Sequence, residues 1–121
     1  MKVGKFWKII INNNKYTVKP VITQKDISNG MMNKKFNNSF DGMLFIMEDG
    51  DHSFWMKNCI IPLDIIFIKN NEVTEIHHNC LPCKEEECER FEGYGDMILE
   101  IPAGHCEEYN IVEGNKITFH Y

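Results

Sequence analysis

The stretch FWMKNCIIPLDIIFI, residues 54–68, is the most apolar part of the chain, yet it contains a lysine, an asparagine and an aspartate. Side chains alternate between the two faces of a strand, so we expect Asp64 to point inward with the neighbouring isoleucines. A buried carboxylate needs hydrogen-bond donors or a cation. Lys57, the Asn58 amide and the N–H groups of the Pro62 turn are close in sequence. We therefore interpret Asp64 as a polar clip for this turn, with a ligand-binding cluster or a catalytic Asp64–Lys57 pair as alternatives.

Glu100, in the run ILEI, is a second carboxylate within an apolar segment. If it lay near Asp64, the two groups would repel each other and the pKa of one would rise. Paired carboxylates of this kind can perform acid–base chemistry or bind a cation. We favour the simpler interpretation, in which Glu100 pairs with a lysine at the edge of a strand.

The composition is typical of one soluble globular domain over residues 1–121, with 43% hydrophobic and 26% charged residues. The net charge is −5, and the 13 lysines and arginines include a single arginine, Arg90. Nucleic-acid-binding proteins usually present a basic face rich in arginine, so we expect no nucleic-acid partner. No run approaches the roughly 20 apolar residues of a membrane span, and residues 1–11 do not resemble a signal peptide. We expect no membrane partner and a cytoplasmic location, where thiols stay reduced.

The N-terminal part predicts a hairpin over about residues 4–22. Two β-prone runs, GKFWKIII and KYTVKPVI, flank the turn signal NNN. Pro20 in the second run favours an edge position there. Thr23 is a candidate N-cap for a short helix over about residues 24–29, and Gly30 would end that helix.

From residue 42 onward, β-prone runs alternate with turn signals. The expected strands are GMLFIM, SFWMKN, LDIIFIK, EVTEIHH, DMILEI and KITFHY, with turns at EDGDH and NN. A long loop covers about residues 79–94, and PAGHCEEYN holds one or two helical turns. In all, eight or nine strands and one or two short helices predict a mainly β domain (β-rich α+β) with a compact, barrel-like shape.

The motif FWMKNCIIPLD, with GMLF before it and LEIPAG after it, resembles the domain-of-unknown-function 192 family over about residues 22–121. Cys59 stands where the family pattern has a threonine. The resemblance implies a compact, barrel-like β-rich domain and no particular reaction. The family occurs in bacteria, archaea and phages, and many of its cellular members resemble exported proteins. We therefore consider a phage-encoded copy, located in the host cytoplasm.

Three cysteines form a C-x2-C-x4-C pattern just after a histidine pair: Cys80, Cys83 and Cys88 follow His77 and His78. Thiolates and imidazoles at such spacing can bind zinc, with at most one of the two histidines and help from His105 or Cys106. Related sequences often carry a similar cysteine pair, which implies a Cys83–Cys88 disulfide as another possibility. Free thiols are the interpretation we favour, and we expect no cofactor and no tightly held metal.

Together these patterns favour a small binding or accessory module for a small molecule or a protein. Its polar pocket, at the mouth of the barrel, would be lined by Trp55, Lys57, Asn58, Asp64 and Glu100. One alternative is a hydrolase-type enzyme that uses Asp64 and Glu100 with Lys57. Another is a structural or protein-interaction domain with an exposed strand edge near residues 16–22. We expect binding rather than catalysis, because no further acid or nucleophile is evident beside Asp64.

Overall fold

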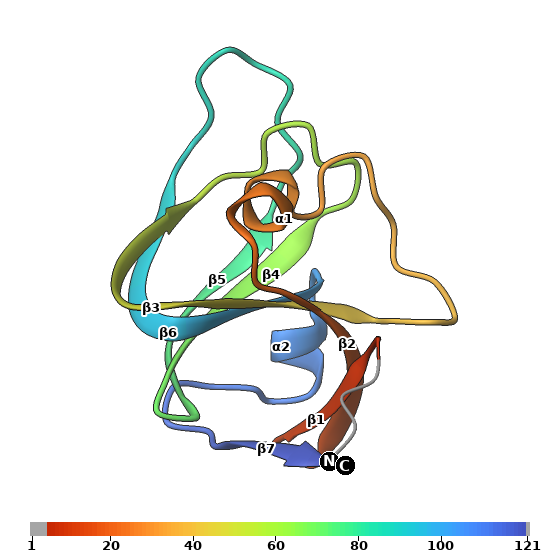
Figure 1. The fold of residues 1–121 in the computed structure, drawn as a ribbon, viewed down its shortest axis with the longest axis vertical. Helices are drawn as coiled ribbons and strands as arrows, with labels where there is room; N and C mark the ends of the chain where they lie inside the picture. Colours follow the sequence, from red (N-terminus) through yellow and green to blue (C-terminus); the bar gives the residue numbers. More distant parts are fainter. Residues whose placement is uncertain (1–4, 121) are drawn as a thin grey trace.

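The fold is known from a computed structural model that describes residues 5–120, and it is drawn in Figure 1. Its elements are β1 (Trp7–Ile11), β2 (Asn14–Val21), α1 (Gln24–Asn29), β3 (Gly42–Phe54), β4 (Leu63–Lys69), β5 (Glu72–Cys80), β6 (Phe91–Pro102), α2 (His105–Glu108) and β7 (Ile117–His120). The strands form one sheet in the order β5-β4-β6-β3-β2-β1-β7. The mainly β class with two short helices is confirmed, but the described chain has seven strands rather than eight or nine.

The sheet curls without closing into a barrel. Its edge strands, β5 and β7, approach each other at one isolated bridge between Glu72 and Lys116. Backbone bonds from Val73 N to Asn115 O (2.9 Å) and from Ile117 N to Asn71 O (2.7 Å) strengthen this contact. The shape is therefore barrel-like, with no continuous ladder between the first and the last strand. Among the described residues, no helix has the length and apolarity needed to cross a membrane.

The predicted turns at NNN and NN both join antiparallel strands, although Asn14 of the first already begins β2. Asn12 and Asn13 have φ values of 46° and 66°, and Asn70 and Asn71 have φ values of 52° and 61°. Asparagine tolerates this left-handed conformation better than most residues, and two such residues in succession match the twist of a hairpin. The short helix α1 also agrees with its sequence signals, because the Thr23 hydroxyl accepts a hydrogen bond from Asp26 N at 3.2 Å.

The expected exposed edge near residues 16–22 is only partly formed, because β2 pairs with β1 over residues 14–18 and with β3, in parallel, over residues 18–21, so that Val18 alone is paired on both sides. Pro20 is therefore paired on one side only. The ladder between β1 and β2 reaches only as far as the Trp7–Val18 pair, so no partner there requires the N–H that Pro20 lacks.

The predicted turn EDGDH and strand SFWMKN are wrong. Strand β3 continues through this segment along β6, with an irregular register between Ile46 and Gly50. Glycines on β6 permit β4 to pack closely against this strand, because a Cβ at Gly95 would lie 2.2 Å from the backbone oxygen of Ile68 on β4. The strand then ends at Phe54, and the segment that follows is bonded to loops instead of a neighbouring strand.

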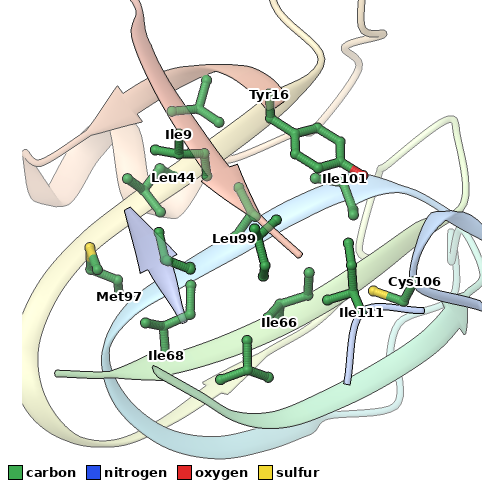
Figure 2. Close-up of a cluster of buried hydrophobic side chains, with 14 residues drawn as sticks. Ile9, Tyr16, Leu44, Ile66, Ile68, Met97, Leu99, Ile101, Cys106 and Ile111 are labelled. Carbon is green, nitrogen blue, oxygen red and sulfur yellow. The ribbon is translucent and has the colours of Figure 1, made fainter. Parts of the chain in front are cut away.

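Apolar side chains cover both faces of the central strands. One cluster includes Ile66, Leu99 and Ile101 and packs against α2, as Figure 2 shows. The cluster on the other face includes Phe45 and Phe67, with Ile27 of α1 at its border. Figure 1 accordingly shows α1 and α2 on opposite sides of β3 and β6. A polar side chain in the buried stretches of these strands, residues 63–68 of β4 and 97–101 of β6, is therefore deeply buried whichever way it points.

Candidate functional site

Asp64 is fully buried and joins segments by hydrogen bonds, but these segments are not the Pro62 turn that we expected. Its Oδ1 accepts a hydrogen bond from Asn79 N at 2.8 Å, and its Oδ2 accepts one from Cys106 N at 2.9 Å. These bonds connect β4 to the end of β5 and to the first turn of α2. The expected partners at residues 57, 58 and 62 do not bond to Asp64, because its true partners are distant in sequence and only the fold brings them close.

Asn58 contributes backbone hydrogen bonds, and it does not line the cleft described below. Its φ is 59°, a left-handed conformation that asparagine adopts more readily than most residues. Its N–H donates to Cys83 O at 2.8 Å, and its carbonyl accepts from Asn33 N at 2.9 Å. Lys57 donates from Nζ to the carbonyl of Glu85. These two polar residues of the motif thus connect the loop at residues 81–90 to the rest of the domain.

A disulfide joins Cys83 to Cys88, so our preference for free thiols throughout is wrong for this pair. Cys59, Cys80 and Cys106 are free and buried. Burial raises the pKa of the Cys80 thiol to about 12, with the charge of Asp64 as a second cause. Because Cys80 points into the core while the other two cysteines are bonded to each other, the C-x2-C-x4-C pattern does not converge on one point. Among residues 5–120, no group of three histidine, cysteine or acidic side chains is placed to hold a metal ion.

A cleft of about 210 Å³ lies between α1, the end of β3 and the segment at residues 55–59. Trp55, Lys57 and Glu100, three of the five predicted site residues, line this cleft, whereas Asn58 and Asp64 do not. Apolar and aromatic side chains share its lining with polar ones, and the ring centroids of Phe45 and Phe54 in this lining are 4.8 Å apart in an edge-to-face arrangement. An apolar hollow with a few polar groups is the usual form of a small-molecule site.

Glu100 is the deepest polar group of the cleft. It lies on the central strand β6, between Met43 of β3 and Ile65 of β4, and its side chain is 3% exposed. Burial raises the pKa of its carboxyl group from 4.5 to about 8. The expected pairing with a lysine at a strand edge is wrong, because this strand is internal and none of the ion pairs among the described residues includes Glu100.

Asp64 and Glu100 point to opposite faces of the sheet. In the ladder between β4 and β6, Asp64 stands opposite Ile101, and Glu100 stands opposite Ile65. Side chains alternate along each strand, so these adjacent positions in the register face opposite ways. Accordingly, Asp64 bonds to the backbone of α2, whereas Glu100 lines the cleft beneath α1. The structure therefore does not bring the two carboxylates together as an acid–base pair.

Two polar residues of the cleft, Arg90 and His52, were not among our candidates. The Arg90 guanidinium lies over the Trp55 ring, 4.2 Å from its centroid, and both residues line the cleft. His52 donates from Nε2 to the Glu48 carbonyl at 2.7 Å. The only available signal was that Arg90 is the single arginine of the sequence. Neither residue belongs to the apolar motif, and only the folded loop brings Arg90 to Trp55.

Comparisons with known proteins give a family and a shared fold. The DUF192 family model (Uncharacterized ACR) matches residues 8–119. A crystal structure from Sinorhizobium meliloti 1021, of a protein proposed as a transcription regulator, is similar with a TM-score of 0.81 and 23% identity over 98% of each chain. A protein of unknown function from Novosphingobium aromaticivorans DSM 12444 is similar with a TM-score of 0.76 and 25% identity, over 93% of this chain and 83% of that one. A search of curated proteins found no match.

Proposed function

Because this chain belongs to the DUF192 family, for which no reaction is described, we propose a function from the site itself: the protein is a binding module that takes a small molecule in the cleft beneath α1. The observation that carries this proposal is Glu100. It is a nearly buried carboxyl group whose oxygens open into the cleft, and among the described residues it forms no ion pair and no side-chain hydrogen bond.

The contrast with Asp64 supports this proposal. Both carboxylates are buried, but Asp64 accepts two backbone hydrogen bonds and so has its polar atoms satisfied within the fold. Burying a carboxyl group without such partners costs free energy, and proteins retain such groups mainly where they have a use. A ligand that bonds to Glu100 would recover that cost. Trp55, Lys57 and Arg90 would then contact the more exposed part of the ligand.

Binding is favoured over catalysis by the composition of the cleft. Glu100 is the only acid among its described lining residues, and Asp64 lies on the other face of the sheet. Hydrolysis by two carboxylates needs both groups at the same substrate. The described lining therefore does not support the hydrolase alternative.

The likeness to the protein from S. meliloti does not extend a regulatory role to this chain, because at 23% identity it carries information on the fold alone. The net charge of −5 is unfavourable for contact with a nucleic-acid backbone. The single arginine is already stacked on Trp55. A partner protein remains an alternative to a small molecule, and the most exposed large apolar side chains of the described chain are Leu81, Ile22 and Val112.

A cytoplasmic location, within the host for a phage-encoded copy, also stands as a proposal. The Cys83–Cys88 disulfide weighs against it, since such bonds persist mainly in oxidising compartments. Alkylation of thiols in intact producing cells tests the location: a free Cys83 and Cys88 would support the cytoplasm, and a bonded pair would contradict it.

The test of the binding function is a screen of small metabolites by thermal shift, followed by amide NMR on each ligand found. We expect ligands that raise the melting temperature, shift amides of residues 27–32 and 52–59, and lose their effect in Glu100→Gln. Glu92→Gln, an exposed position on the same strand, is the matched control and should retain the effect. Ligands that act equally on both variants, or that shift amides elsewhere only, would contradict the proposal.

A further inference from the structure

The groups around Glu100 indicate which chemistry its ligand would bring, if the cleft is a binding site as proposed above. Glu100 lies at the bottom of the cleft with its backbone engaged on both sides, by β3 and by β4. The N–H groups of these strands are used in the ladders, so they are not free to donate to the Glu100 carboxyl group. Asp64 differs, because the N–H groups of Asn79 and Cys106 donate to its carboxylate. A hydrogen-bond donor for Glu100 must therefore come from outside the sheet.

The walls of the cleft favour a positively charged donor. Phe45, Phe54 and Trp55 line the same hollow as Glu100. Aromatic faces attract cations, and a cation among aromatic rings is a recurring mode of ammonium recognition. The cleft already shows this preference at its rim, where Arg90 is stacked on Trp55. A buried carboxylate and an aromatic wall thus select for the same kind of group.

A protonated amine fits these surroundings better than a metal ion does. Magnesium and calcium take six or more oxygen ligands, and Glu100 is the single carboxylate of the described lining. An ammonium group needs only acceptors for its three N–H bonds, and its alkyl chain suits apolar walls. We propose that the ligand of this cleft is an amphipathic small molecule whose protonated amine forms an ion pair with Glu100 beside the contacting rings of Phe45 and Phe54.

The ion pair would couple binding to pH. Burial raises the pKa of Glu100 to about 8, so below that pH the empty cleft holds a neutral carboxyl group. Binding then converts the carboxyl group and the free ammonium ion into a carboxylate–ammonium pair, and the carboxyl proton leaves to the solvent. Only the ionised fraction of the protein is competent to bind. The apparent Kd should therefore fall about tenfold from pH 6 to pH 7 and several-fold more to pH 8, then level off.

The other titratable groups near Glu100 do not produce this dependence. They come from every neighbouring segment: Lys34, His52, Lys57, Cys59, Cys80 and Arg90. Burial raises the pKa of Cys59 to about 11 and that of Cys80 to about 12, so both remain thiols up to pH 9. A pH dependence that persists in a His52→Gln variant excludes the histidine of the described lining as its source.

The experiment compares n-butylammonium with 1-butanol, which has a similar shape and no charge, by amide NMR titration at pH 6, 7 and 8. We expect saturable shifts at residues 27–32 and 52–59 with n-butylammonium, and the stated fall in Kd with pH. The carboxyl carbon resonance of Glu100 should titrate at lower pH when n-butylammonium is bound. Glu100→Gln should lose at least tenfold in affinity at pH 8, together with the pH dependence, and Glu92→Gln, the exposed position on the same strand, should retain both.

Three outcomes would overturn the inference: equal affinity for the two probes, unchanged binding in Glu100→Gln, or no saturable shift in the cleft with n-butylammonium. The proposed binding function is tested separately, by the metabolite screen. If the metabolite screen yields ligands that depend on Glu100 and carry no cationic nitrogen, the cleft is a binding site and the amine inference is wrong. If the screen yields no ligand that depends on Glu100, the binding function itself fails.

Discussion

At the scale of single residues, the two buried carboxylates show how location decides between a structural and a functional role. Asp64 is bonded to backbone N–H groups of β5 and α2, and Glu100 is buried without such partners. An unmet polar group in the interior reduces stability, whereas a satisfied one fixes the segments that it joins. We therefore expect opposite results when each carboxylate is replaced.

Glu100→Gln should stabilise the protein in a manner that depends on pH. The carboxyl pKa is about 8 in the folded chain against an ordinary value of 4.5. Between these values the folded state holds a proton that the unfolded state has lost, so this group lowers the free energy of unfolding as pH rises from about 4.5 to 8. Urea denaturation at pH 5 and pH 8 should show a larger gain for the variant at pH 8. Equal gains at both pH values would contradict the buried, unpaired state of Glu100.

Asp64→Ala should instead destabilise the protein by about 1–3 kcal/mol, because it leaves the N–H groups of Asn79 and Cys106 without their acceptor. Thermal melting followed by circular dichroism measures this effect. Amide exchange at those two residues should accelerate as well. A melting curve that matches the unmodified protein would show that Asp64 does not hold these segments.

At the scale of elements, the loop at residues 81–90 is held by three kinds of interaction. The disulfide closes it upon itself, Lys57 bonds to its Glu85 carbonyl, and the backbone of Asn58 and Met56 bonds to Cys83. This loop also carries Arg90 to Trp55 at the cleft. The polar residues of the conspicuous apolar motif therefore position one wall of the proposed site.

The left-handed conformation of Asn58 predicts a difference between two substitutions. Glycine adopts a φ of 59° without steric cost, whereas the Cβ of alanine costs about 1–2 kcal/mol there. Asn58→Gly should remain close to the unmodified protein in its free energy of unfolding, and Asn58→Ala should lose stability. If both variants melt at the same temperature, the conformation of Asn58 is not strained.

The disulfide predicts a thiol count that differs from a fully reduced chain. Titration under denaturant without reductant should find three free thiols, those of Cys59, Cys80 and Cys106, and five after reduction. A double Cys83→Ser, Cys88→Ser variant should lose about 2 kcal/mol or less, because the closed loop is short. Its amide exchange should increase at Asn58 and Cys83 first. Five free thiols from the outset would show that the bond is absent.

At the scale of the whole molecule, a single curled sheet creates two separate interiors. Strand β4 over residues 63–68 and strand β6 over residues 97–101 are buried on both faces, and each face has its own cluster and its own short helix. This arrangement separates the clip at Asp64 from the cleft at Glu100 although the two residues occupy neighbouring positions of one ladder. The curl depends on a close approach of β4 to β6 at Gly93 and Gly95.

Gly95→Ala should disturb this curl. Its Cβ would lie 2.2 Å from the Ile68 carbonyl oxygen, which is backbone and cannot move aside as a side chain can. We expect a loss of more than about 3 kcal/mol, or a failure to fold. Ser53→Ala, at an exposed position of the paired strand β3, is the control and should change little. A stable Gly95→Ala variant with an unchanged NMR spectrum would contradict the packing.

The sequence by itself determined the local features of this protein. The asparagine pairs 12–13 and 70–71 specified turns, Thr23 and Gly30 bounded α1, and the β-prone runs specified a mainly β domain. The motif was sufficient to indicate the family. Each of these signals depends on residues that are close in the chain, where backbone preferences and short hydrogen bonds act directly.

Tertiary structure decided the partners and the faces. Asp64 found its donors at residues 79 and 106, Glu100 became a central residue of the sheet, and Arg90 met Trp55 across a loop. Strand pairing sets which residues stand opposite each other, and a register shifted by one residue would exchange the faces of every side chain. That register follows from the packing of the whole sheet. The sequence therefore identified the two carboxylates as candidates but did not show that they lie on opposite faces of the sheet.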